Sequence, residues 1–393
     1  MKQAILTMIT AIITSLGKNG LSFHEPIYPI IHDSIQPDSE ARVYLLEEAL
    51  ELWQALLQQT PSDNIPSPLV TLLESLLPLL ELGSDHLRQC FEILESYTLL
   101  SPSITYDTQI LTPLLQSQKE MLSLLNSSRA RDAALSPHVL QMMIQTLSIP
   151  TYFTSDTKPM AFQHFITTMV NTGYLQSLLS LLHEAYSYHQ DPRPSRRPPD
   201  VIGRGEASLF TLLSHLVLAD PHVFLRVVNT ITVGNDPNTL TWLLTEWFHQ
   251  YDATPDTLRR KTQLLALTSL LSVSPSPTPL LSSLQSLFTI YTDTLIELAD
   301  GAAEDNRGDY LFSPALPGEM LPNWPDSDSP EDVRKRQVAN WDPVYVINAR
   351  DFVAKGLRQA IEECGGQQAF EQQWITDRID QDVVRAFAAL GVL

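Results

Sequence analysis

Polar and apolar residues alternate with helical periodicity along most of the chain, most clearly between positions 41 and 61. Four polar residues in this stretch are spaced by four, three and four positions: Glu47, Glu51, Gln54 and Gln58. Such spacing places side chains on one face of an α-helix. The other positions, Val43 and Trp53 among them, are almost all apolar. A helix with so broad an apolar surface needs neighbours on several sides, as in a stack of helical hairpins.

The same periodicity continues on both sides of this stretch, and no strand pattern interrupts it. Prolines and capping side chains mark many of the predicted helix starts, as in Asp220-Pro221, Asp236-Pro237 and Thr254-Pro255, because proline is favoured at the first helical position. We expect Pro78 and Pro113 to kink or split their helices. The predicted helices are 3–16, 24–35, 41–59, 67–82, 85–100, 105–126, 137–148, 156–170, 172–190, 204–218, 221–232, 237–251, 255–272, 277–299, 332–340, 348–363 and 367–390.

These helices predict an all-α fold, a HEAT-like helical repeat solenoid in which antiparallel helix pairs form a superhelix. Ser39 and Ser84 open two helices 45 residues apart, close to the roughly 40–47 residues of a HEAT or armadillo unit. We expect repeats over residues 1–299, an acidic proline-containing loop or insert over 300–330, and further repeats over 331–393.

The predicted insert is the strongest candidate for a binding site. Residues 300–332 hold nine acidic side chains against the single Arg307. A long loop within a tight helical array is often functional, although solubility would also explain these charges. The candidate partner-binding residues are Asp300, Glu304, Asp305, Asp309, Asp326, Asp328, Glu331 and Asp332.

Two segments resemble a known family. The run from Tyr44 to Trp53, YLLEEALELW, and the later Arg334-Lys335-Arg336-Gln337 with Asp342-Pro343-Val344 resemble the importin-eleven-like branch of the importin-β (karyopherin-β) nuclear transport receptors. The resemblance elsewhere is one of leucine-rich helical pattern. This chain would correspond to the C-terminal part of such a receptor.

The resemblance implies a protein that carries cargo through the nuclear pore in a Ran-dependent cycle. Its partners would be protein cargo, which we expect to be basic, and the Phe-Gly nucleoporins of the pore. In this family Ran-GTP is bound chiefly by N-terminal repeats, which this chain lacks. The protein would shuttle between cytoplasm and nucleus. The alternative is a HEAT or armadillo scaffold subunit of a multiprotein complex without a role in transport.

Charge and composition agree with a protein partner. A formal charge of −20 disfavours nucleic acid and anionic membranes and favours basic ligands. Hydrophobic residues make up 44% of the chain and charged ones 18%, enough apolar surface to exclude a disordered chain. Cys90 and Cys364, the two cysteines, give no disulfide or metal pattern.

We expect no enzyme, cofactor or metal site. His183-Glu184 resembles the start of a zinc protease motif, but that motif needs a second histidine at position 187, where this chain has Ser187. No Gly-x-Ser-x-Gly elbow is present. The proline-rich loop at 191–200 carries Arg193, Arg196 and Arg197, which either bind an acidic partner or form a solvated linker.

The N-terminal segment is predicted to be an amphipathic helix. Its apolar run at 4–16 has the outline of a signal peptide, but Gln3, Thr7, Thr10 and Thr14 fall on one helical face. Since no run of 18 apolar residues occurs, we also expect no helix that inserts into a membrane.

Overall fold

The structure is a computed structural model in which helices account for nearly all regular structure. Its description covers residues 1–62, 65–81, 86–122, 135–191, 198–199, 201, 203–234, 236–254, 256–304 and 329–392. Within these ranges no strand occurs, and the β pairing found is an isolated bridge between Val233 and Asp236. The predicted all-α class is confirmed.

The chain divides into two compact units. The first is Met1–Leu175 with Pro325–Ala339, and the second is Gln176–Trp324 with Asn340–Leu393. The helices of the first unit are α1 (Lys2–Leu16), η1 (Gly17–Phe23), α2 (Tyr28–Ile35), α3 (Arg42–Gln59), α4 (Ser67–Glu81), α5 (Leu87–Leu100), α6 (Pro102–Thr105), α7 (Thr108–Met121), α9 (Leu135–Thr146), α10 (Thr157–Asn171) and all but the end of α19 (Pro330–Trp341). Those of the second are α11 (Tyr174–Gln190, from its third residue), α12 (Arg204–Ala219), α13 (Pro221–Thr230), α14 (Thr239–Asp252), α15 (Thr257–Leu271), α16 (Thr278–Leu281), α17 (Leu284–Glu304), α20 (Pro343–Val346), α21 (Ala349–Glu363), α22 (Gln367–Phe370), the π-helical turn η3 (Glu371–Ile375) and α23 (Gln381–Ala389).

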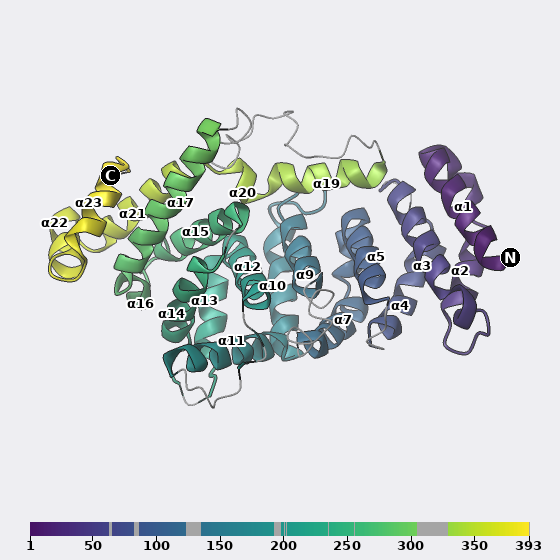
Figure 1. The fold of residues 1–393 in the computed structure, drawn as a ribbon, viewed down its shortest axis with the longest axis horizontal. Coiled ribbons are helices and arrows are strands. Elements are labelled where there is room, and N and C mark those ends of the chain that lie inside the picture. Colours follow the sequence, from purple (N-terminus) through teal and green to yellow (C-terminus); the bar gives the residue numbers. More distant parts are fainter. Residues whose placement is uncertain are drawn as a thin grey trace. The chain divides into compact units, whose positions relative to one another are not determined.

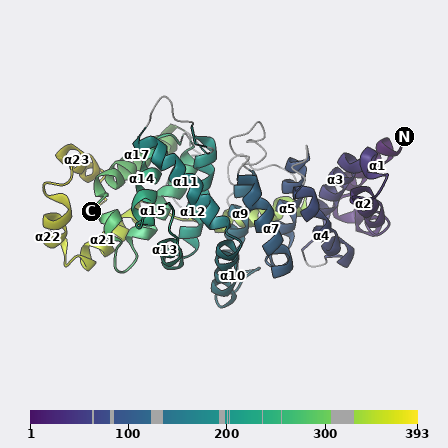
Figure 2. The same ribbon diagram turned by 90° about the horizontal axis from the view of Figure 1, so that it is seen from below.

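Helices of the first unit form two layers, as expected for stacked helix pairs. In one layer α1 packs on α3, α3 on α5 and α5 on α9. In the other, α2 packs on α4, α4 on α7 and α7 on α10. Figure 1 shows the first row side by side, and Figure 2 shows the second row beneath it. Each inner helix therefore has a neighbour on both sides, the arrangement that its broad apolar surface predicted.

Helix α3 lies at the centre of this unit. Trp53 is fully buried, and its Nε1 donates to the Tyr97 hydroxyl of α5 at 2.9 Å. That hydroxyl donates in turn to the Leu69 carbonyl of α4. The predicted polar stripe is solvent-facing, since Glu47 and Glu51 are exposed. Val43, which the pattern assigned to the apolar surface, is instead 77% exposed because it lies in the first turn of α3.

Helix α15 has the corresponding place in the second unit, where it packs against α12, α17 and α21. Its contact with α21 is unusually close. A Cβ built on Gly356 of α21 would lie 2.6 Å from Thr268 Cγ2 and 2.8 Å from Ser272 Oγ. The two helix backbones can approach this closely because position 356 has no side chain.

Most predicted helices are confirmed, but several boundaries were wrong. The helix expected over 24–35 begins at Tyr28. The one expected over 105–126 starts at Thr108, where the Asp107 carboxylate accepts from the Gln109 amide at 2.8 Å and caps a new helix. The segment 277–299 consists of α16 and α17, and 367–390 consists of α22, η3 and α23.

Prolines and caps account for some of these outcomes. Asp220 caps α13 and Pro221 is its first residue, as predicted. By contrast, α14 begins after Asn238 and α15 is capped by Asp256, so the Asp236-Pro237 and Thr254-Pro255 starts were wrong. Pro78 and Pro113 lie inside α4 and α7 without splitting them.

The N-terminal helix corrects one expectation about membranes. Lys2–Phe23 is long and apolar enough to cross a membrane by length and composition, so the criterion of 18 consecutive apolar residues was too strict. Signal sequences and core helices pass the same test, and here Leu6 and Ile13 are buried while Met8 is exposed. The absence of membrane insertion stays a prediction.

Candidate protein-interaction site

The predicted acidic residues have different environments in the structure. Asp300 is an exposed residue of α17, and Glu304 is the last residue of that helix. The expected insert therefore starts after 304 rather than at 300. Asp305, Asp309, Asp326 and Asp328 lie outside the described residues. The remaining two, Glu331 and Asp332, belong to the first turn of α19.

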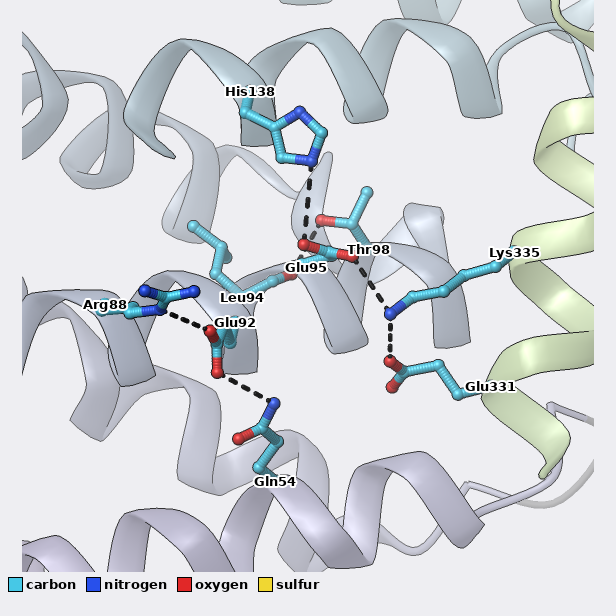
Figure 3. Close-up of polar contacts among 9 residues, drawn as sticks. All are labelled: Gln54, Arg88, Glu92, Leu94, Glu95, Thr98, His138, Glu331 and Lys335. Carbon is cyan, nitrogen blue, oxygen red and sulfur yellow. Dashed lines mark hydrogen bonds and ion pairs between the residues drawn. The ribbon is translucent and has the colours of Figure 1, made fainter. Parts of the chain in front are cut away.

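Glu331 is a buried member of an ion-pair network. It is 3% exposed, and its carboxylate lies 2.9 Å from Lys335 Nζ. Lys335 also lies 3.3 Å from Glu95 of α5, whose other oxygen is 3.9 Å from His138 of α9. Figure 3 shows these contacts joining three helices. Burial lowers the pKa of Lys335, but the two carboxylates outweigh it and the pKa is raised overall.

Asp332 is also engaged in the structure of α19. Its carboxylate accepts a hydrogen bond from the Ser329 hydroxyl, which accepts from the Asp332 backbone amide at 3.2 Å. Acidic side chains in a first turn also interact favourably with the helix dipole. Glu331 and Asp332 therefore have roles in holding α19, and neither offers a free carboxylate to a partner.

Arg334 joins α19 to the end of α3. Its guanidinium donates to the carbonyls of Thr60 at 2.7 Å and Leu57 at 3.1 Å, both at the C-terminal end of α3. The Leu57 carbonyl also accepts from the Thr60 backbone amide that caps the helix. Arg334 adds a charged donor at this end, where a cation favours the negative end of the helix dipole. Burial lowers the pKa of Arg334, while Glu331 and Asp332 favour its charged form.

An apolar cluster continues the contact toward α9. Val338 of α19 packs with Leu99, Met142 and Ile149. Tyr152 lies against this cluster and donates from its hydroxyl to the Leu99 carbonyl at 2.7 Å. Helix α19 thus runs across the ends of α3, α5 and α9, as Figure 1 shows for the last two. The segment that resembled a family signature, Arg334 to Gln337, forms the centre of this contact.

A second polar contact links α3 to α5 on the same side of the unit. Glu92 accepts from Arg88 Nε at 3.0 Å and from Gln54 Nε2 at 3.3 Å (Figure 3). Gln54 belongs to the polar stripe that the sequence pattern predicted. The stripe is therefore partly used to bind the neighbouring helix, which a single-helix pattern does not reveal.

The second unit contains an apolar groove near the C-terminal end of the chain. Its volume is about 820 Å³, and residues of α17, α21, α22, η3 and α23 line it. Three phenylalanines contribute to the walls: Phe288, Phe370 and Phe387. Ala388, which is exposed, lies at the edge of the groove. An aromatic side chain from a partner would fit such a surface.

Other sequence candidates have structural explanations. Trp242 and Trp247 are buried, and Trp247 Nε1 donates to Gln263 at 3.1 Å, so the aromatic side chains of α14 pack inside the unit. His183 packs its ring against Trp242. The arginines at 193, 196 and 197 lie outside the described residues.

One group of residues was missed at the sequence level. His189, Glu246 and His249 bring donor atoms together that could hold a metal ion. A signal for it exists in the sequence, because Glu246 and His249 are three positions apart on one helix and so share a face. The contribution of His189 could not be found, since 57 residues separate it from Glu246.

Comparison with protein families gives a match along nearly the whole chain. Residues 3–392 match the family described as "Importin-11-like, TPR repeats". Importin-11 of Homo sapiens is 27% identical over 389 residues, which cover 98% of this chain and 36% of the relative. The importin beta-like protein kap113 of Schizosaccharomyces pombe is 21% identical over 381 residues, 96% of this chain and 34% of the relative.

A solved structure shares the fold. It is that of Lph2, titled a novel bidirectional nuclear transport receptor of S. cerevisiae, with a TM-score of 0.73 and 18% identity. The match covers 98% of this chain and 38% of that one. This chain therefore spans about a third of the length of the relatives that it matches.

Proposed function

Because the chain belongs to the importin-11-like family of helical repeat proteins, we propose that it acts as part of a nuclear transport receptor. The observation that carries this proposal is the family match over residues 3–392. The chain would bind protein cargo and pass with it through the nuclear pore, shuttling between cytoplasm and nucleus. Binding would be non-catalytic. Ran-GTP would act through the N-terminal repeats of such a receptor.

Cargo would be basic and would be attracted by the acidic insert. The net charge of −20 supports this, because opposite charge raises association rates and fixes orientation. Since Glu331 and Asp332 hold α19, the carboxylates proposed to meet cargo are those of Asp305, Asp309, Asp326 and Asp328, with Asp300 nearby in sequence.

Neutralising these four residues tests the cargo proposal. We expect the variant with Asp305, Asp309, Asp326 and Asp328 changed to Asn to bind a basic nuclear peptide more weakly than the unmodified chain. Its affinity should also depend less on salt. Fluorescence anisotropy between ~50 and ~300 mM salt covers Debye lengths of roughly 14 to 6 Å and would measure both effects.

A control variant should lose the same charge elsewhere. The substitutions Asp38→Asn, Glu40→Gln, Glu74→Gln and Asp156→Asn remove four exposed acidic groups from the first unit. Equal affinities for the two variants at every salt concentration would contradict a specific role of the insert. Tighter binding by the insert variant would instead indicate that the insert covers the cargo surface in the free protein.

The groove of the second unit is proposed to receive phenylalanines of Phe-Gly nucleoporins. Its phenylalanine-lined walls and its volume of about 820 Å³ support this occupant, because aromatic pairs add about 0.5–1.5 kcal/mol beyond the burial of their surface. Binding of one aromatic side chain in this groove would be weak. Weak binding suits a partner that must be released quickly during passage through the pore.

Neighbouring residues of α23 offer a matched test of the groove. Ala388 lines the groove whereas Ala389 does not, and both are exposed. We expect Ala388→Asp to weaken binding to an immobilised Phe-Gly repeat peptide, because it places a charge in the apolar groove. Ala389→Asp adds the same charge to the same helix end outside the groove and should leave binding unchanged. Surface plasmon resonance would measure this. Equal binding by both variants would contradict the proposed occupant.

A further inference from the structure

Four side chains with metal-binding donor atoms come together in the second unit. They belong to three helices: His189 to the last turn of α11, Glu206 to the first turn of α12, and Glu246 and His249 to α14. Neither the family match nor the proposed transport function gives these residues a role.

Three of the four have their donor atoms within 4.8 Å of one another. His189 Nδ1 lies 2.6 Å from Glu246 Oε1, and His249 Nδ1 lies 3.9 Å from the same oxygen. The two imidazole rings are 4.2 Å apart at an angle of 32°. Among the described residues, Glu246 forms ion pairs with these two histidines. Each imidazole has a nitrogen that can bind a metal ion.

Glu206 is the second, independent observation. It is 2% exposed, and its Oε1 has no hydrogen-bond partner among the residues that the structure describes. Its carboxyl group lies beside the Glu246 carboxylate, with which it makes a side-chain hydrogen bond. A buried carboxylate oxygen without a partner is costly and needs an explanation. A cation between the two carboxylates would supply one.

We propose that His189, Glu206, Glu246 and His249 bind a Zn²⁺ ion through two imidazole nitrogens and two carboxylate oxygens. Zinc accepts this set of donors in tetrahedral geometry, with bonds of about 2.0–2.2 Å. Donor atoms in such a site are about 3.3 Å apart, given those bond lengths. The separations of His189 and His249 from Glu246 Oε1, 2.6 and 3.9 Å, lie on either side of this value. Glu206 lies outside the group of three whose donor atoms are within 4.8 Å, so its side chain would have to move toward the histidines when the ion binds. The charge also balances, because two carboxylates neutralise one divalent ion.

The ion would join the two helices that flank the proline- and arginine-rich connection. His189 precedes that connection and Glu206 follows it, while α14 supplies the other two ligands. The His249 side chain is 58% exposed and that of His189 22%, which gives a metal ion access from solvent. Zinc bound only to the folded chain would stabilise it by mass action.

Zinc titration of the full chain after removal of metal by chelation tests the proposal. We expect one Zn²⁺ per chain by competition with a chromophoric chelator, and a higher melting temperature after zinc addition. Co²⁺ in the same site should show the intense visible absorption of tetrahedral coordination. His249→Ala and Glu206→Gln should each weaken zinc binding by about 100-fold or more, because loss of an outer-shell partner alone costs about 10- to 100-fold.

The variants are chosen so that folding is preserved. His249 is exposed, and glutamine has the shape of glutamate, so the helical circular dichroism of both variants should match that of the unmodified chain. His222→Ala removes an exposed histidine of α13 outside the cluster and should leave zinc affinity unchanged. Zinc binding that is equal in all three variants, or absent from the unmodified chain, would overturn the proposal.

Discussion

Lys261 is the residue whose burial has the clearest consequence for stability. It is fully buried in α15. Burial lowers its pKa from 10.5 to about 7, although the Asp342 carboxylate favours the charged form. Near neutral pH the native lysine therefore releases its proton, whereas a lysine in the unfolded chain keeps it until about 10.5. The unfolded state then binds more protons, and stability rises with pH.

A pH series on Lys261→Met would measure this effect. Between pH 7 and 9, the free energy of unfolding of the unmodified chain should rise relative to that of the variant by up to about 1.4 kcal/mol per pH unit. Urea unfolding at each pH gives both values. Lys355→Met, at an exposed position of α21, is the control and should not change the slope. Parallel curves for the Lys261 variant and the unmodified chain would contradict the lowered pKa.

Sequence reasoning succeeded at residues whose environment is decided within their own helix. Trp53 lies opposite the stripe of Glu47 and Glu51, so its burial follows from the helical period alone. Val43 falls on the same apolar surface by period, but it is exposed because it lies in the first turn of α3. Lys261 could not be predicted either, because a lysine is almost never fully buried and no pattern marks the exception.

Among the elements, the contact between α15 and α21 makes the sharpest prediction. Alanine favours helix over glycine by about 1 kcal/mol, so Gly356→Ala would stabilise an isolated helix. In this structure the new methyl group would lie 2.6 Å from Thr268 Cγ2. Thr268 cannot turn freely, since its hydroxyl bonds to the Leu264 carbonyl and to Tyr291. Overpacking costs about 1–3 kcal/mol.

We therefore expect Gly356→Ala to lower the free energy of unfolding by about 1 kcal/mol, after the helix propensity is subtracted from the overpacking cost. Thr268→Ser removes the Cγ2 atom and leaves the hydroxyl. A double-mutant cycle should then show Gly356→Ala to be less harmful in the Thr268→Ser background. Denaturant unfolding of the four proteins gives the coupling, and its absence would contradict the close approach.

Helix ends were the least predictable part of the elements. Asp107 lies inside the helix predicted over 105–126, but it caps α7, which begins only at Thr108. Asp236-Pro237 reads as a helix start, yet α14 begins only at Thr239. Side chains of this type cap helices and also form turns between them. Whether such a residue caps a helix or forms a turn depends on which neighbouring helix the segment must reach. The residues next to it in sequence do not determine this.

At the scale of the whole molecule, the fold class and family were predictable and the sites were not. Helical period over hundreds of residues specifies stacked helices, and the family match agrees with this. The sites depend instead on residues brought together from distant positions. The sequence analysis placed Glu331 among the residues expected to bind a partner. In the structure its carboxylate pairs with Lys335, which also lies next to Glu95. The two histidines and two glutamates of the proposed zinc site come from three separate helices.

The bonds from Arg334 to the end of α3 span 274 and 277 residues of sequence. During synthesis, α3, α5 and α9 leave the ribosome long before α19 exists. At ~5–20 residues per second, this delay is roughly 14 to 55 s. Until α19 is made, the carbonyls of Leu57 and Thr60 lack the Arg334 donor and the apolar surface around Leu99 lacks Val338. The first unit thus starts to be translated before the second, but it is completed only when residues 325–339 have been made.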